Sequence, residues 1–244
     1  MITLQSTASA ADMEAVVLAR MIRNGETVFV GVNSPVPMAA ALMARATHAP
    51  DATLITIAGG INPAPVQYTP ATSDAVFAAG SASVIDNLAF YDLVARGGID
   101  LTFLGGAQID RHGQVNSSFL GEQGAPSTRF PGGGGAAFIL PLAKRVAIWR
   151  ASHDRRIFVE KCEFVTAAGN LECVVTPLCV FGIRAGEMAV ESVHPGVDKG
   201  LLQERTGFPL QLDAAPETEP PTPAELEALN HADPTGIRFS EFKS

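Results

Sequence analysis

The chain has 244 residues, of which 47% are hydrophobic and only 17% are charged, and its formal net charge is −8. That length allows one large domain or two small ones around a substantial core. The acidic balance, without any block of lysine or arginine, argues against a nucleic-acid binder, and no apolar run approaches the roughly 18–20 residues of a membrane span.

The first half of the chain alternates helix and strand signals. A helix is predicted over residues 12–24, a buried strand over 27–32, a second helix over 34–47 and a second buried strand over 52–58. Gly59-Gly60 then marks a turn. Strand, helix and strand in this order predict a parallel βαβ unit, whose functional loops lie at the carboxyl ends of the strands.

The second half has more consecutive strand signals. The predicted elements are a short strand or loop over 74–80, a helix over 83–97, a strand over 101–104, a polar loop over 121–129, and strands over 143–150, 156–159, 173–183 and 188–193. We therefore predict an α/β fold over residues 1–213: a single open, mainly parallel sheet flanked by helices, with extra strands in its C-terminal half. The tail, residues 214–244, is expected to wrap the surface and to include a short helix at 223–230.

The most informative stretch is the run of four glycines Gly132 to Gly135, which apolar sequence follows from Ala136 onward. Consecutive glycines cost backbone entropy, so they indicate positive φ angles or a ligand close to main-chain N–H groups. Exposed N–H groups of this kind can bind phosphate or a developing oxyanion. The alternative is a flexible connector. Because neither serine nor asparagine dilutes the run, a shaped loop is favoured.

Cysteine and histidine usage points away from metal or thiol chemistry. Cys162, Cys173 and Cys179 are an odd, sparse set with apolar neighbours, so buried reduced thiols are expected. The histidines are scattered, and no metal site is predicted. The first residues lack the pattern of a secretory signal, so a cytoplasmic location is expected. The excess of apolar residues also hints at a buried subunit interface.

Four polar residues are candidates for binding or catalysis, each with an ordinary structural alternative. Asn33 follows the first strand and either lines a pocket or caps a helix. Gln108 either hydrogen-bonds a substrate or satisfies the backbone. Arg129 either meets a phosphate or carboxylate, or is a solvated surface residue. His194, before Pro195, is either a base or a turn residue.

Four segments together resemble the β subunit of the class I coenzyme A (CoA) transferase family. They are Leu104–Asn116, with its Gly-Gly-Ala-Gln-x-Asp-x-x-Gly pattern, Arg129–Ala137, Val174–Phe181 and Val193–Val197. Within this family the chain is similar to the glutaconate CoA-transferase type, and it also resembles the related steroid-ring-cleaving acyl-CoA hydrolase branch. It implies a CoA-transferase/NagB-like fold, an acyl-CoA substrate and an α-subunit partner, in a heterodimer or heterotetramer, with no permanently bound cofactor.

The resemblance also implies site residues. In such β subunits a glutamate attacks the thioester carbonyl, and backbone N–H groups stabilise the oxyanion. The implied oxyanion donors are Gly134 and Gly135. The implied binding residues are Gly132, Gly133, Ala136, Arg129, Asn33, Gly59, Gly60 and Gln108. The expected glutamate, two positions ahead of the first glycine of the Gly-Gly turn, falls on Ile57.

Isoleucine cannot act as a nucleophile, and the nearest upstream acid is Asp51. We therefore hypothesise that the α subunit supplies the catalytic carboxylate, as the resemblance to the hydrolase branch implies. The first alternative is a CoA- or nucleotide-binding regulatory protein that has lost catalysis. The second is a dinucleotide-dependent oxidoreductase. It fits poorly, because Gly31–Pro35 lacks the Gly-x-Gly-x-x-Gly pattern.

Overall fold

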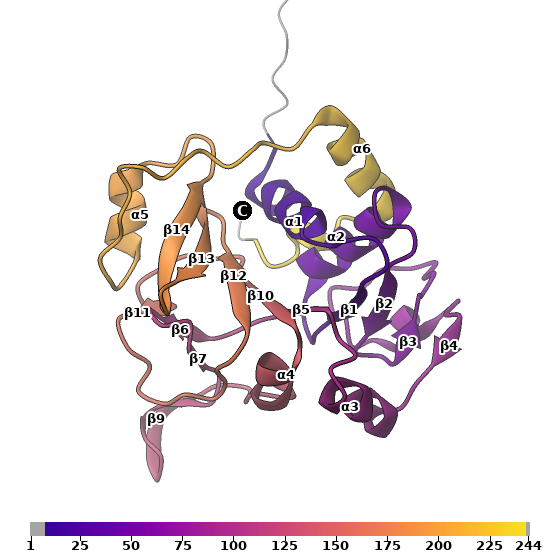
Figure 1. Cartoon of the computed structure of the whole chain (residues 1–244), viewed down its shortest axis with the longest axis horizontal. Helices are drawn as coiled ribbons and strands as arrows, with labels where there is room; N and C mark the ends of the chain where they lie inside the picture. Colours follow the sequence, from indigo (N-terminus) through magenta and orange to yellow (C-terminus); the bar gives the residue numbers. More distant parts are fainter. Residues whose placement is uncertain (1–7, 243–244) are drawn as a thin grey trace, which may run out of the picture.

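The computed structural model describes residues 8–242, which form a layered α/β structure around one large sheet (Figure 1). Residues 1–7 and 243–244 lie outside the described residues. The prediction that the first residues are not a secretory signal falls mostly on this undescribed N-terminal segment. In spatial order the nine strands are β14 (Glu187–Val193), β13 (Cys179–Arg184), β12 (Leu171–Val175), β10 (Arg145–Trp149), β5 (Leu101–Leu104), β1 (Thr27–Val30), β2 (Thr53–Thr56), β3 (Gly60–Ile61) and β4 (Ser83–Val84).

The centre of the sheet is parallel and its edges are antiparallel. Strands β12, β10, β5, β1 and β2 pair in parallel. Strands β13 and β14 at one edge and β3 and β4 at the other pair antiparallel. The predicted fold class, a single mainly parallel sheet with extra strands in the C-terminal half, is confirmed.

Helices cover both faces because successive side chains of a strand point to opposite sides. Val28 and Val30 of β1 pack with α1 (Ala10–Arg20), α2 (Pro35–Ala46) and α6 (Pro223–Ala232). Phe29 points the other way and packs with the side chains of α3 (Asn87–Ala95) and α4 (Ala136–Leu142). Each fully buried side chain of this size contributes about 1.5–3 kcal/mol.

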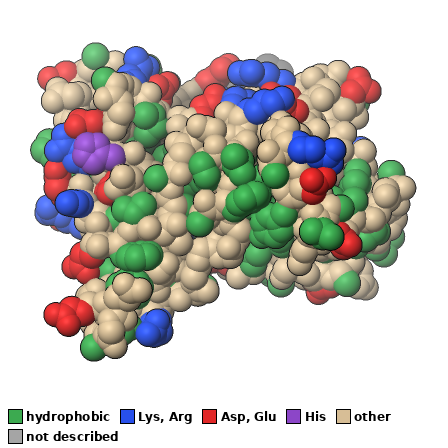
Figure 2. All heavy atoms as spheres, turned by 60° about the horizontal axis from the view of Figure 1, so that its bottom comes forward, with side chains coloured by type: hydrophobic (Ala, Val, Ile, Leu, Met, Phe, Trp, Pro, Cys, Tyr) green, Lys and Arg blue, Asp and Glu red, His purple; other side chains and the backbone are tan. Residues whose placement is uncertain are grey.

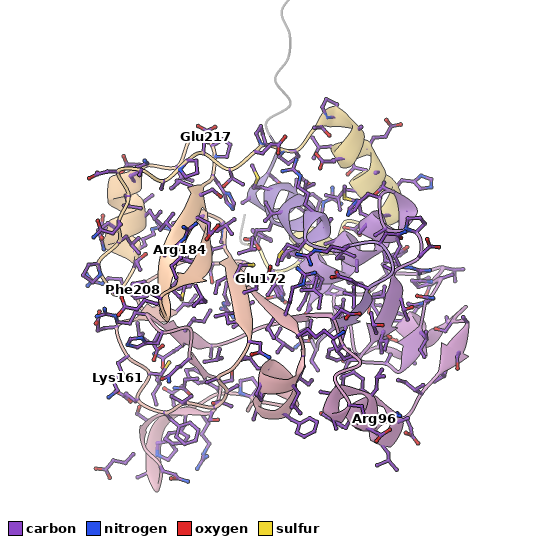
Figure 3. The ribbon with its side chains drawn as sticks, in the orientation of Figure 1. Arg96, Lys161, Glu172, Arg184, Phe208 and Glu217 are labelled. Atoms are coloured by element: carbon purple, nitrogen blue, oxygen red, sulfur yellow. The ribbon has the colours of Figure 1, made fainter. Side chains whose placement is uncertain are left out.

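A small second sheet lies on the same side as α4. Its strands are β11 (Phe158–Val159), β6 (Gln108–Asp110) and β7 (Val115–Asn116). Nearby is α5 (Lys199–Arg205), a helix that the sequence did not predict. Phe208, labelled in Figure 3, follows α5, and its ring centroid lies 6.2 Å from that of Phe181 on β13.

Two local predictions are wrong for reasons of backbone chemistry. The strand predicted over 173–183 is two strands, β12 and β13, because the chain reverses at Thr176. The Thr176 Oγ1 accepts the N–H groups of Leu178 and Cys179, both at 3.2 Å, and Pro177 has no N–H to donate to a sheet. The polar loop over 121–129 belongs to a hairpin of β8 (Phe119–Glu122) and β9 (Ala125–Arg129), which projects from the body in Figure 1.

Two further segments differ in detail. Residues 74–80 contain the 3₁₀ helix η1 (Ala75–Ala78), where Asp74 accepts the N–H of Val76 at 3.0 Å. The helix predicted over 83–97 starts at Asn87, because Asp86 caps it and β4 precedes it. The short helix expected at 223–230 is present as α6, and the 3₁₀ helix η2 (Ile237–Phe239) follows it.

The tail is joined to the body by a buried arginine. Arg238 is 4% exposed, and its guanidinium donates to Asp12 at 2.8 Å and to Asp233 at 2.9 Å. Upstream, the N–H of Thr218 donates to Val193 of β14 at 2.8 Å. Among residues 8–242, no helix is both long and apolar enough to cross a lipid bilayer.

Candidate active site

The carboxyl ends of the five parallel strands open into one cleft of about 1770 Å³. Parallel strands bring their carboxyl ends to the same edge of a sheet, so loops that are distant in sequence meet there. The segments after these strands also line the cleft: Gly31–Asn33 after β1, Ile57 after β2, Gly105–Gln108 after β5, Arg150–Arg156 after β10, and Pro177–Leu178 one residue beyond β12. The cleft is larger than the 300–1,000 Å³ typical of a small-molecule pocket, which suits an extended ligand.

The glycine loop forms one wall of this cleft and is a shaped turn. Gly132 has φ +97° and Gly134 has φ +52°, a region that other residues rarely adopt. A Cβ atom on Gly133 would lie 2.6 Å from the methyl group of Thr166, and one on Gly135 would lie 2.5 Å from the hydroxyl of Tyr91. The prediction of a shaped loop is confirmed.

The same loop presents unused hydrogen-bond donors. The N–H of Gly132 donates to Ser117 O at 2.8 Å, and that of Ala136 donates to Gly133 O at 2.7 Å. Between them, the N–H groups of Gly133, Gly134 and Gly135 have no acceptor within the part of the chain that the structure describes. All three glycines line the cleft, so these amides are available to a ligand atom that carries negative charge.

Ile57 follows β2, is half-buried and lines the cleft. Its neighbour Thr56 is fully occupied in structure: the hydroxyl donates to Phe77 O at 2.9 Å and accepts the N–H of Gly60 at 3.2 Å. This strand end therefore offers neither a carboxylate nor a free hydroxyl.

The acids that line the cleft lie elsewhere, at Asp154 in the loop after β10 and at Glu241 near the C-terminus. Partial burial opposes ionisation of Asp154, but hydrogen bonds from Arg156 outweigh it and lower the pKa of this carboxyl. The backbone N–H of Arg156 donates to Asp154 Oδ1 at 2.8 Å. Asp154 is thus an ionised residue that shapes its own loop.

Asn33 and Gln108 both line the cleft but differ in their freedom. Asn33 has φ +46°, is exposed, and its side chain has no hydrogen-bond partner within residues 8–242. Gln108 is 9% exposed; its Oε1 accepts from Asn116 at 3.0 Å and its Nε2 donates to Arg156 O at 3.2 Å. The amide of Asn33 is available to a ligand, whereas that of Gln108 holds the loop after β5 against the loop after β10.

Three predicted binding residues are not brought to the cleft. Gly59 and Gly60 form the turn after β2, where a Cβ would meet the backbone carbonyls of Ile85 and Phe77, respectively, so close packing explains these glycines. Arg129 is exposed at the end of β9, outside the residues that line the cleft.

The buried histidines serve as hydrogen-bonded core residues. His153 bridges the hydroxyls of Thr176 and Thr206, both at 3.0 Å, and burial lowers its pKa to about 3. His194 contacts Thr218 Oγ1 at 2.9 Å and Thr176 O at 2.8 Å, and burial lowers its pKa to about 4. Both rings are neutral at pH 7, and neither has a free nitrogen to act as a base.

The cysteines are buried as predicted. Burial raises the pKa of the Cys162 thiol to about 12, that of Cys173 to about 12, and that of Cys179 above its usual range. Thiols of this kind are poor nucleophiles at neutral pH.

The sequence analysis missed several residues of the cleft. Tyr91 comes from α3, and Arg205 from α5, so only tertiary packing brings them in. Arg150 and Arg155 had a signal, because they follow a buried parallel strand at its carboxyl end.

Comparison with known proteins identifies the class to which this fold and cleft belong. Residues 11–199 match the coenzyme A transferase family. The B subunit of 3-oxoadipate CoA-transferase from Pseudomonas knackmussii is 36% identical over 245 residues, covering 92% of this chain and 93% of that protein. The chain therefore belongs to the coenzyme A transferase family, and the resemblance inferred from its motifs is confirmed.

The proteins similar to this chain carry names that describe different reactions. The IpdB subunit of a cholesterol ring-cleaving hydrolase from Mycobacterium tuberculosis is 30% identical over 58% of this chain and 63% of that protein. The decarboxylase AibA/AibB superposes with a TM-score of 0.90 at 29% identity, covering 97% of this chain and 99% of that one. Glutaconate coenzyme A-transferase from Acidaminococcus fermentans superposes with a TM-score of 0.85 at 27% identity, covering 98% of each. The relatives are parts of two-subunit enzymes, and this chain corresponds to their β subunit.

Proposed function

We propose that this β subunit cleaves an acyl-CoA thioester together with an α subunit that contributes the catalytic carboxylate. The observation that carries the proposal is the pairing, in one cleft, of three unused amide donors with an apolar residue, Ile57, at the end of β2. Coenzyme A enters as part of the substrate, and no permanently bound cofactor is needed. A cytoplasmic location belongs to the proposal, and the free thiols of the three buried cysteines support it.

The amides act on the charge that develops at the thioester. When a nucleophile adds to the carbonyl carbon, negative charge moves onto the carbonyl oxygen, and donors already in place stabilise it. Gly134 and Gly135, with Gly133, supply such donors without reorganisation, because the turn is fixed by the Gly132 and Ala136 hydrogen bonds. Removal of one donor of this kind typically costs about 2.7–4 kcal/mol of activation free energy.

The partner's carboxylate has two possible roles, which differ in the acceptor. It can attack the thioester itself, so that a mixed anhydride forms and the CoA thiolate leaves. The thiolate then attacks the enzyme's side of the anhydride, which releases the acyl group as a carboxylate and leaves CoA on the partner's carboxyl group, from which a second acid takes it up by the same steps in reverse. Alternatively it removes a proton from water, whose oxygen adds to the carbonyl carbon as the C–S bond breaks and the thiolate takes up the proton. In both cases Ile57 and its neighbours form an apolar wall beside the thioester.

The surface supports assembly with a partner. Among the exposed large hydrophobic side chains, Leu88 lies on α3 and Phe138 and Leu142 lie on α4, with 80%, 42% and 38% exposure. The ring of Phe138 lies 5.7 Å from that of Tyr91, which lines the cleft. Figure 2 shows hydrophobic side chains gathered on this side of the molecule, so an α subunit that covers them would also reach the cleft.

A second candidate is a CoA-binding regulatory protein without catalysis. The observation that favours it is the same apolar Ile57 at the position of the expected glutamate. The oxidoreductase alternative has no comparable support, since the chain belongs to the coenzyme A transferase family.

The test is the release of free CoA from a panel of acyl-CoAs by the co-expressed αβ complex, with and without an added acceptor carboxylate. Free CoA released without acceptor supports hydrolysis; formation of the acceptor's own CoA thioester, measured by chromatography of the same mixtures, supports transfer. A matched variant, Ile57→Glu, should gain a trappable glutamyl-CoA thioester on this chain that the parent complex lacks. Tight CoA binding with neither free CoA nor a new CoA thioester formed would favour the regulatory candidate, and glutamyl-CoA trapped on the parent β chain would contradict the proposal.

A further inference from the structure

The cationic side chains of this protein fall into two groups. Within residues 8–242 most arginines and lysines hold a carboxylate or a carbonyl group, as Arg20, Arg111, Arg145 and Arg238 do. Five form neither a side-chain hydrogen bond nor an ion pair in that part of the chain: Arg129, Arg150, Arg155, Lys161 and Arg205. Three of the five, Arg150, Arg155 and Arg205, line the cleft.

These three arginines come from two distant parts of the sequence and differ in depth. Arg150 directly follows β10 and is half-buried, and its Nε atom is buried without a partner. Arg155 lies in the loop before β11, and Arg205 is the last residue of α5; both are exposed. The cations therefore extend from the interior of the cleft to its solvent-exposed rim.

The acids around them offset only part of this charge. Burial lowers the pKa of Arg150, and the nearby Glu241 and Asp154 act against that shift, but neither forms a hydrogen bond or an ion pair with Arg150. Asp154 is engaged by Arg156, and Glu241 is exposed. Glu14 of α1, which lies near Arg150, is fully buried without a hydrogen bond, and burial raises its pKa so that the neutral form is favoured. A chain with a net charge of −8 thus keeps a cationic wall in this cleft.

The spacing along the sheet indicates which anion fits. Arg150 follows β10 and Ile57 follows β2, and the order β10-β5-β1-β2 separates them by three strand spacings, about 14 Å. The pantetheine arm of CoA is about as long as four extended residues, which is also roughly 14 Å. A carboxylate on a short acyl chain lies much closer to the thioester than that.

We propose that Arg150, Arg155 and Arg205 form the subsite that binds the phosphate groups of coenzyme A. The proposal rests on the proposed function, which places the thioester between Ile57 and the glycine loop. Guanidinium groups donate two parallel hydrogen bonds to phosphate oxygens, and unpaired arginines are already free to do so. Arg129, outside the cleft, takes no part.

The test is the binding of CoA, dephospho-CoA and an acyl-pantetheine to the αβ complex, measured by calorimetry together with steady-state kinetics. Arg155→Gln and Arg205→Gln should each weaken CoA binding about tenfold, the order expected for one lost charge-assisted hydrogen bond. KM for acyl-CoA should rise by a similar factor with kcat unchanged. Turnover of the acyl-pantetheine, which lacks the nucleotide, should not change.

Two unpaired cations outside the cleft provide matched controls. Arg129→Gln and Lys161→Gln should leave CoA affinity within twofold of the parent. Because Arg150 is half-buried, Arg150→Lys is the suitable change there, with the melting temperature recorded to separate folding from binding. The variant that loses less affinity for dephospho-CoA than for CoA identifies the arginine that contacts the 3′-phosphate.

Three results would overturn the subsite: unchanged CoA affinity in all cleft variants, equal losses for acyl-pantetheine and acyl-CoA, or loss of the αβ complex itself, which would mean that these arginines pair with the partner. Failure of the proposed function looks different. CoA binding that depends on Arg155 and Arg205, in a complex that neither hydrolyses acyl-CoA nor transfers CoA to an acceptor, retains the subsite and removes the reaction.

Discussion

The end of β2 and the end of β10 occupy the same edge of one sheet, yet they are built for different purposes. After β2, Thr56 uses its hydroxyl within the turn, and Ile57 presents an apolar side chain. After β10, the segment Arg150–Arg156 lines the cleft and includes Arg150 and Arg155. The topology thus decides where a site forms, and the residues that follow each strand decide what that part of the site does.

The largest effect is expected at the glycine loop, which lines the same cleft as both strand ends. In Gly132→Ala the alanine would have to adopt φ +97°, a region that L residues rarely adopt, so the turn must rearrange and the amides that follow it lose their positions. We expect kcat of the αβ complex to fall about 10²–10³-fold. Gly124→Ala, in the β8–β9 hairpin where a Cβ meets nothing within 4 Å, is the control. A loss in kcat below about tenfold for Gly132→Ala would contradict the role of these amides.

The second prediction compares hydrogen-bonded side chains at the two strand ends. Thr56→Val should lower the free energy of unfolding by about 1–3 kcal/mol, because the buried Phe77 carbonyl and Gly60 amide each lose their bond to the hydroxyl. His153→Phe should cost less, about 1 kcal/mol, since Thr176 and Thr206 keep bonds to Cys179 N–H and Leu202 O. Urea denaturation of both variants measures the difference. A larger loss of unfolding free energy for His153→Phe than for Thr56→Val would show that the hydrogen bonds after β10 contribute more to stability.

The third prediction concerns acid. His153 and His194 have pKa values lowered to about 3 and about 4 in the folded protein, so the unfolded chain, with histidines near 6.5, takes up protons first as the pH falls. Each should remove up to about 1.4 kcal/mol of stability per pH unit between about 6.5 and its folded pKa. The urea midpoint of unfolding should fall steadily as the pH is lowered across this range. His153→Phe should have a shallower slope; an unchanged slope would mean that His153 does not contribute.

The smallest effect is expected at Arg129, which the family resemblance assigns to binding and the fold places on an exposed strand. Arg129→Gln should change the free energy of unfolding by no more than about 0.5 kcal/mol. It should also leave KM for acyl-CoA within twofold, since the side chain does not line the cleft. A KM increase of tenfold or more would show that Arg129 reaches the substrate in the αβ complex.

Much of the fold followed from local patterns. Strong periodicity or clear glycine and proline signals mark three of its parts: the βαβ unit over residues 27–56, the shaped glycine loop and helix α6 in the C-terminal tail. The reversal at Thr176 was missed although Pro177 marks it, because a continuous apolar run outweighed one proline. The hairpin over 119–129 was missed because polar, exposed strands lack the alternation that identifies a strand.

The sequence by itself determined the family and the order of the central strands and helices along the chain. It also showed isoleucine where a glutamate was expected. These features depend on residue identity and short-range spacing. Only the tertiary structure decided which residues share the cleft. It brought Tyr91 and Arg205 in, left Arg129 out, and used the amide of Gln108 for internal hydrogen bonds. The physical reason is that parallel strands gather their carboxyl ends from across the chain, and long-range packing then fixes which side chains remain free.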